Sequence, residues 1–341
     1  MKKCMLALVV LGAYADVTSA QSTVTLYGTL DVSGRYVNAD GQSHHLSEAT
    51  DGINPSRLGF RGTEDLGDGL NAGFTFETGT NPDTGTANAK FWNRRSTVSL
   101  FGRFGEVRLG RDFTPTFWSN ALFDAFGYNG LGASFNPRQL YGGTRMDNTI
   151  GYFLPSNLGG FYGQAMVASG EGGTSADRPG RYVGARVGFA AGPFEVGFAA
   201  GQQRFAVPLG LAAAGDTQNT YNIGGSWNFG VAKLMGYYDR ETLNSYHENM
   251  GSISAVIPFG LSEVHVGYDR SRLTLPSGAS SSVDQIKATY QYNLSKRTAI
   301  YATASRMDNK DATRLTLPGA AGLTTAGGKS QGAEFGLRHF F

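Results

Sequence analysis

The sequence predicts an all-β protein in which antiparallel strands form a barrel that spans a membrane. Apolar and polar side chains alternate with a period of two in one segment after another, as in strands with one wet face. No run of about twenty apolar residues follows residue 20, so no transmembrane helix is expected. Short and long connections also alternate along the chain, which is typical of membrane barrels with turns at one end and loops at the other.

The N-terminus reads as a secretory signal peptide. Lys2 and Lys3 form a basic start, residues 4–15 are mostly apolar, and small residues offer a cleavage site after Ala20. Ala15 is a second candidate site, but cleavage there would leave an unusually short leader. We therefore expect a signal peptide over residues 1–20 and one domain, the barrel, over residues 21–341.

The composition excludes several classes of protein. The formal net charge of +2 becomes +1 without the leader, which carries two lysines and one aspartate, and this near balance argues against a nucleic-acid partner. A mean hydropathy of −0.23 is too polar for a helical membrane protein. The five histidines lack metal-ligand spacing, and no catalytic motif or nucleotide-binding fingerprint is present. We expect no enzyme activity, cofactor or metal.

We expect sixteen strands. In the first, Thr25, Tyr27 and Asp31 share one face, and Leu26 and Leu30 share the other. An even number places both termini on the same side, and a barrel of about sixteen strands is wide enough for an aqueous channel. The expected strands lie near 24–38, 52–64, 69–80, 91–101, 104–111, 146–155, 160–169, 180–191, 193–205, 217–229, 231–242, 245–258, 261–273, 283–293, 297–308 and 329–341.

The last strand carries a terminal signature. Phe335, Leu337 and Phe341 fall on one face of residues 329–341, and the chain stops on the aromatic ring. This ending resembles the C-terminal signature of bacterial outer-membrane barrels, which the barrel-insertion machinery reads. The resemblance implies that these three residues form an assembly signal and that the protein lies in the outer membrane of a Gram-negative bacterium, in contact with lipid and lipopolysaccharide.

The third long connection, residues 112–145, is the longest segment without alternation. It is rich in aromatic side chains, among them Phe117, Trp118 and Tyr128, and this content argues against disorder. A loop of this length is usually functional or disordered. The rings must be buried somewhere, and the inner wall of the barrel is available.

The mature chain resembles the general bacterial porins of the trimeric sixteen-stranded type, most closely their β-proteobacterial branch. In that family the third loop folds into the lumen, where wall arginines face acids on the loop and constrict a passive channel for small hydrophilic solutes and ions. The resemblance implies the same architecture here, with self-association as a homotrimer. The matching segments are STVTLYG at 22–28, SRLGFRG at 56–62, DAFGY at 124–128 and TRMDN at 144–148.

Arg57 and Arg145 match the wall arginines of the family within these segments, and Arg95 is a looser match that is shifted by two residues. Each arginine shares a face with polar residues, so all three should point into water. The opposite faces carry Leu58 and Phe60 beside Arg57, Val98 and Leu100 beside Arg95, and Met146 and Ile150 beside Arg145. An unpaired charge facing lipid would cost about 2–4 kcal/mol at mid-bilayer.

The loop departs from the enterobacterial pattern, because the two acids of that pattern fall near Gly130 and Ser134. Asp124 remains, either at the constriction or in hydrogen bonds within its own loop. Intact arginines facing few acids predict a pore that prefers anions. Arg138 is a further candidate for the constriction, and additional lumen charges are expected at Arg35, Arg61 and Arg108.

Two alternatives remain open. A substrate-selective channel, for example for sugars or organic acids, would want aromatic residues along the lumen, whereas the residues expected there are mostly small and polar. A non-conducting adhesin or structural barrel would have a closed lumen.

Overall fold

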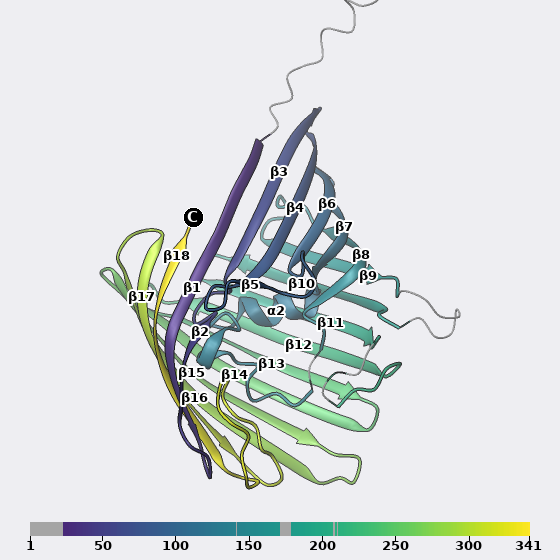
Figure 1. Ribbon diagram of the computed structural model, residues 1–341. Coiled ribbons are helices and arrows are strands. Elements are labelled where there is room, and N and C mark those ends of the chain that lie inside the picture. The colour runs from purple at the N-terminus through teal and green to yellow at the C-terminus, as the bar shows by residue number, and fades with distance from the viewer. Residues whose placement is uncertain (1–22, 141, 171–178, 207–208, 210) are drawn as a thin grey trace, which may run out of the picture.

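A computed structural model describes residues 23–140, 142–170, 179–206, 209 and 211–341; the expected signal peptide lies outside this range. Sixteen long antiparallel strands pair edge to edge, and the last pairs with the first, so that the sheet closes into a barrel (Figure 1). The predicted fold class and strand number are therefore confirmed. Two short strands, β2 (His45–Thr50) and β5 (Thr86–Ala87), belong to long connections and are additional to the sixteen.

The barrel strands agree closely with the predicted positions. Two of them begin later than expected, at Arg57 instead of residue 52 and at Arg95 instead of residue 91. The sixteen are β1 (Thr23–Ala39), β3 (Arg57–Gly67), β4 (Leu70–Asn81), β6 (Arg95–Gly102), β7 (Gly105–Phe113), β8 (Arg145–Phe153), β9 (Phe161–Ala168), β10 (Tyr182–Ala191), β11 (Phe194–Arg204), β12 (Thr217–Asn228), β13 (Lys233–Leu243), β14 (Tyr246–Phe259), β15 (Ser262–Thr274), β16 (Ser280–Asn293), β17 (Thr298–Asn309) and β18 (Lys329–Phe340).

The late start of β3 has a physical cause in Asp31. Its carboxylate accepts hydrogen bonds from three successive backbone amides, those of Gly52, Ile53 and Asn54, at 3.3, 3.0 and 2.7 Å. Amides that point together at one carboxylate cannot join a strand ladder. The neighbour of β1 is therefore β2 at one end and β3 at the other, with residues 51–56 as a break between them.

The two faces of the wall differ as the alternation predicts. Thr29 and Asp31 are 1% and 0% exposed on the inner side of β1, whereas Leu26 and Leu30 are 55% and 44% exposed on the outer side. Large apolar side chains are exposed in the same way on strands around the whole barrel. Such a surface is stable when it faces lipid acyl chains.

The barrel closes between the two ends of the chain. β1 and β18 pair from Thr29 opposite Phe340 to Ala39 opposite Ser330, and the two strands lie side by side in Figure 1. Beyond this register, Phe341 exchanges two backbone hydrogen bonds with Gly28, each of 3.1 Å. The terminal residue thus completes the ladder.

The connection between β7 and β8, residues 114–144, is here called L3. It opens with helix α2 (Pro115–Leu122), which the Thr114 side chain caps by accepting a hydrogen bond from the Phe117 amide, with proline in the first turn. A short 3₁₀ turn, η1 (Gly130–Gly132), follows. α2 packs against β9–β12 and η1 against β16–β18, and Figure 1 places α2 inside the ring of strands. None of the helices in the described residues is both long and apolar enough to cross a membrane.

Candidate functional site

A cluster of cationic side chains lies on the inner wall at β3, β4 and the start of β6. Glu77 of β4 stands between two arginines: its carboxylate lies 2.6 Å from Nε of Arg94 and 3.5 Å from Nε of Arg57. The Tyr27 hydroxyl donates a third contact to Glu77 at 3.1 Å. One carboxylate therefore fixes two guanidinium groups and compensates only one of their charges.

Arg145, at the start of β8, continues this cationic wall. Its guanidinium carbon lies 4.0 Å from the ring centroid of Phe113, and the guanidinium groups of Arg94 and Arg95 lie 5.9 and 5.7 Å from the same ring. Cation–π attraction of about 0.5–2 kcal/mol per pair helps to hold like charges close together. The ring of Phe113 thus serves as a common platform for three arginines.

Arg95 and Arg108 belong to a second, charge-balanced group on the same wall. Nε of Arg95 lies 2.9 Å from Asp112, and Nη1 of Arg108 lies 2.6 Å from the same carboxylate. Arg108 also contacts Glu106 at 2.9 Å. Two arginines and two acids here cancel, so this group adds little net charge to the lumen.

L3 is held against the opposite wall by side chains that line the inner face of β10–β18. The Asn222 side chain donates to the Thr116 carbonyl at 3.1 Å, and Ser254 accepts from the Ala125 amide at 3.1 Å. Gln285 donates to the Leu131 carbonyl at 2.9 Å. Because these contacts are spread over several strands, L3 is fixed along its length and not only at its ends.

A chain of hydroxyl groups strengthens this attachment. Tyr128 donates to Tyr237 at 3.0 Å, Tyr237 donates to Ser134 at 2.9 Å, and Ser134 donates to the Asp124 carboxylate at 2.9 Å. Burial raises the pKa of Tyr128 well above the ordinary tyrosine value, so its hydroxyl keeps its proton. Each step therefore has a donor and an acceptor, and the chain ends on a charge that can accept.

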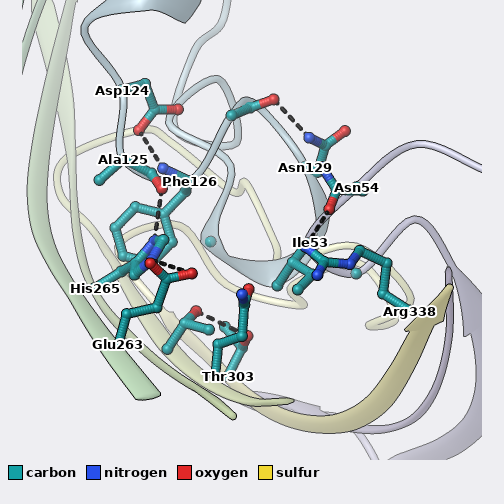
Figure 2. Close-up of a pocket in the computed structure, with 15 residues that line it drawn as sticks. Ile53, Asn54, Asp124, Ala125, Phe126, Asn129, Glu263, His265, Thr303 and Arg338 are labelled. Atoms are coloured by element: carbon teal, nitrogen blue, oxygen red, sulfur yellow. Dashed lines mark hydrogen bonds and ion pairs between the residues drawn. The ribbon is translucent and has the colours of Figure 1, made fainter. Parts of the chain in front are cut away.

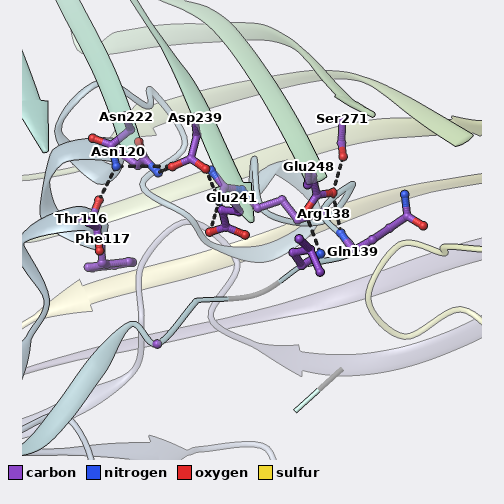
Figure 3. A network of polar contacts seen from close by, with 12 residues as sticks. Thr116, Phe117, Asn120, Arg138, Gln139, Asn222, Asp239, Glu241, Glu248 and Ser271 are labelled. Carbon is purple, nitrogen blue, oxygen red and sulfur yellow. Dashed lines mark hydrogen bonds and ion pairs between the residues drawn. The ribbon is translucent and has the colours of Figure 1, made fainter. Parts of the chain in front are cut away.

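Arg138 forms the other main anchor, as Figure 3 shows. It bridges from L3 to β13, where Nη1 lies 3.3 Å from Asp239 and 3.2 Å from Glu241. Nearby, the Glu248 carboxylate accepts hydrogen bonds from the backbone amides of Gln139 and Leu140 at 2.8 and 2.6 Å. These contacts attach the C-terminal part of L3, at residues 138–140, to the barrel wall.

An open space of about 370 Å³ lies between L3 and the part of the wall that carries Arg57, Arg94 and Arg145, here called the arginine wall. On one side it is lined by Arg57, Arg94 and Arg145, and on the other by L3 side chains that include Phe117, Trp118, Tyr128 and Phe135. Asp51 is the only carboxylate among the described residues that line it, against three arginines. The space is therefore strongly cationic on one side and aromatic on the other.

A model of the Gram-negative porin family matches residues 7–312. The chain belongs to the Gram-negative porin family. This porin is 40% identical to outer membrane porin protein 32 of Delftia acidovorans over the full length of both chains. It is 27% identical to an outer membrane porin of Bordetella pertussis, over 91% of this chain and 95% of the relative.

Among solved structures, the anion-selective porin from Comamonas acidovorans superposes with a TM-score of 0.85 at 36% identity, covering 94% of this chain and all of that one. The predicted resemblance to β-proteobacterial porins is thereby confirmed, as are the channel function and the outer-membrane location. The matches point to a family of channels and not to a family of enzymes.

Two of the residues predicted for the constriction lie together. Arg57 and Arg145 line the space beside L3. Arg95 lies on the same wall, but its guanidinium turns to Asp112, and Arg94 takes the place beside the space. Sequence parity missed Arg94 because it precedes the first residue of β6, where strand alternation does not yet hold.

Asp124 and Arg138 do not line the space beside the arginine wall. The Asp124 carboxylate is fully buried and accepts from the Phe126 and Tyr128 amides, each at 3.1 Å, on the side of L3 that faces the barrel wall. The Arg138 side chain is 7% exposed in its pairs with Asp239 and Glu241. For Asp124, the alternative of hydrogen bonding within its own loop is the one that the structure shows.

The additional lumen charges differ in their surroundings. Arg35 is buried in a pair with Glu334, with 2.7 Å between the charged groups. Arg61 lies over the ring of Tyr27, 5.3 Å from its centroid. Glu77 and Asp51 could not be singled out from the sequence, because neither acid belongs to a recognisable motif. No group of three or more histidine or acidic side chains in the described part of the chain is placed to hold a metal ion.

Proposed function

We propose that this porin is a general diffusion channel that prefers anions, and that the space between the arginine wall and L3 is its constriction. The observation that supports this proposal is the charge of the lining, which contains three arginines and, among the described residues, one carboxylate, Asp51. L3 contributes no acid to it, since Asp124 is the only carboxylate in residues 114–144 and faces the other way. A ring of positive charge in a narrow pore attracts anions and repels cations. The name of the structural relative, an anion-selective porin, agrees with this proposal.

The selection in this proposal is electrostatic and needs no catalytic step. Arg57 and Arg94 are held by Glu77, and Arg145 is held over Phe113, so the cationic groups keep fixed positions while ions pass. Fixed charges in a partly desolvated channel act more strongly than charges on mobile side chains in bulk water. The aromatic face of L3 narrows the path without supplying a competing charge.

The reversal potential in a KCl gradient tests the proposal. The purified porin in a planar bilayer should give stepwise conductance and a potential directed by chloride. The triple variant Arg57→Gln, Arg94→Gln, Arg145→Gln should conduct with little preference. A cation-directed potential in the unmodified protein would contradict the proposed constriction. Saturation of conductance by one solute would favour the substrate-selective channel, and absence of conductance the adhesin or structural barrel.

We further propose that the working unit is a homotrimer in contact with lipid and lipopolysaccharide. The signal peptide is cleaved after Ala20. The insertion machinery reads the signal at Phe335, Leu337 and Phe341. All three lie on the outer face of β18 or beyond its end, 62%, 51% and 42% exposed. Chemical cross-linking in native outer membranes should give a product of three chains, and N-terminal sequencing of the mature protein should begin at Gln21. A product of one chain would contradict the trimer.

A further inference from the structure

A second cavity adjoins the tip of L3, at residues 124–132 (Figure 2). It shares Asn54, Gly127 and Asn129 with the space at the arginine wall, but none of the three wall arginines lines it. Its volume is about 240 Å³, below the roughly 300–1,000 Å³ of sites for drug-sized ligands. The tip of L3 forms one side of the cavity, and residues Gly52–Asn54 between β2 and β3 form another. The inner faces of β15–β18 form the remainder. Uncharged polar side chains on the strands, Thr289, Gln291 and Thr303, contribute to the lining. Its size restricts an occupant to a small polar solute.

Arg338 of β18 supplies a positive charge to this cavity. The residue is 8% exposed, its Nη1 donates to the Asn54 side chain at 3.2 Å, and its guanidinium lies 4.2 Å from the Phe340 ring centroid. No carboxylate of the described residues lies within ion-pair distance of it, and its buried Nε has no hydrogen-bond partner. A guanidinium with no acid in direct contact can pair with a carboxylate from outside.

Glu263 of β15 supplies a negative charge, and Figure 2 shows it across the cavity from Arg338. Its nearest cationic partner would be His265, whose Nε2 lies 3.6 Å from the carboxylate, beyond ordinary hydrogen-bond distance. Nδ1 of His265 lies 2.7 Å from the Ala125 carbonyl, which ties the ring to L3. The Glu263 side chain is 27% exposed, and a carboxylate has about four acceptor sites. Glu263 therefore keeps acceptor sites for a solute beside its contact with His265.

The charge of the second acid in the lining, Asp124, is compensated by its own contacts. Its carboxylate accepts from two L3 amides and from Ser134, and Lys287 lies 3.8 Å away. The charges available to a solute are therefore one guanidinium on one side and one carboxylate on the other.

We propose that this cavity is a binding station for small zwitterions that carry one carboxylate and one ammonium group, such as amino acids and their short derivatives. The solute carboxylate pairs with Arg338 and the ammonium pairs with Glu263. The station rests on the proposed channel function, because solutes reach it through the lumen. Binding at one pair of opposite charges near water is weak, as passage requires.

Titration with a series of ω-amino acids tests this proposal and measures the spacing. Glycine, 4-aminobutyrate and 6-aminohexanoate are added to the detergent-folded porin in a calorimeter at neutral pH, and to bilayers under constant KCl. Acetate and methylammonium serve as singly charged comparisons. We expect at least one zwitterion to bind, and to reduce the KCl current, at a concentration at least fivefold lower than either comparison.

Variants assign the effect to the two charges. Arg338→Gln and Glu263→Gln should each weaken zwitterion binding at least fivefold, whereas Arg272→Gln, which removes an exposed charge on β15 away from the cavity, should not. Equal binding of acetate and zwitterion, or no effect of Glu263→Gln, would overturn the proposal. The calorimetric signal does not depend on conductance. A non-conducting barrel that binds zwitterions would contradict only the proposed channel function. A conducting barrel that binds no zwitterion would contradict only the proposed binding site.

Discussion

The ammonium group of Lys287 lies 2.7 Å from the Asp269 carboxylate, and both side chains have no exposed area. The same ammonium is 3.8 Å from the equally buried Asp124 of L3 and 4.5 Å from the Phe126 ring centroid. One lysine on β16 therefore joins a neighbouring strand to the inward loop. It is the counter-charge for two buried carboxylates, those of Asp269 and Asp124.

Lys287→Met should destabilise the barrel by about 3–5 kcal/mol, because it leaves buried carboxylates without a counter-charge. The temperature at which the folded band disappears on a gel measures the effect. Lys310→Met is the matched control, since Lys310 pairs with Asp284 at 2.6 Å but its side chain is 48% exposed, and such pairs contribute less than about 1 kcal/mol. Equal shifts for the two variants would show that the Lys287 contact is solvated and not structural.

Glu77→Gln should increase the preference for anions up to about tenfold at low salt. A unit charge about 6 Å from a passing ion contributes about 0.7 kcal/mol even in a water-like dielectric, and Glu77 lies beside Arg57 and Arg94. Its removal favours the anion and disfavours the cation by this amount each, so the ratio changes by about 1.4 kcal/mol. The reversal potential in a KCl gradient measures the change. Glu64→Gln, at an exposed position on β3, is the control and should leave the potential unchanged. A decrease in anion preference would mean that Glu77 acts chiefly by holding the two guanidinium groups in place.

The anion preference should fall as salt rises. The Debye length shrinks from about 30 Å at 0.01 M salt to about 3 Å at 1 M, so ions in concentrated KCl no longer sense the arginines at a distance. Reversal potentials at a fixed concentration ratio, repeated over this range, should approach the value set by ionic mobilities. The triple arginine variant should show little dependence on salt. A preference that stays constant would point to direct ion contact with Arg57, Arg94 or Arg145.

The strand pattern could be predicted because lipid and water impose a strict alternation on each strand. That alternation located sixteen strands and assigned Arg57 and Arg145 to the lumen. It failed where the backbone leaves the ladder: Arg94 precedes β6, and residues 51–56 turn away because the Asp31 carboxylate binds three of their amides.

The roles of L3 residues could not be predicted from the sequence, because parity has no meaning in a loop. Asp124 and Arg138 are charged residues in a loop near a pore, and composition alone cannot tell which side of the loop each faces. The partners that decide it, Lys287 and Asp239, lie more than a hundred residues away along the chain. The same holds for the pairing of Arg338 with Asn54 across the closed barrel.

Phe341 should matter more for assembly in the cell than for the stability of the finished barrel. Its backbone pairs with Gly28, while its ring faces outward and is 42% exposed. Phe341→Ala keeps the backbone pairing and removes the ring, which should lower the free energy of unfolding in lipid vesicles by no more than about 1–2 kcal/mol. If the ring is part of the signal that the insertion machinery reads, the amount of folded porin in the outer membrane should fall much further than this loss of stability explains. Phe198→Ala, at an outward ring on β11 that is 47% exposed, is the control for loss of lipid contact, and equal yields of the two variants in cells would reduce Phe341 to an ordinary lipid-facing side chain.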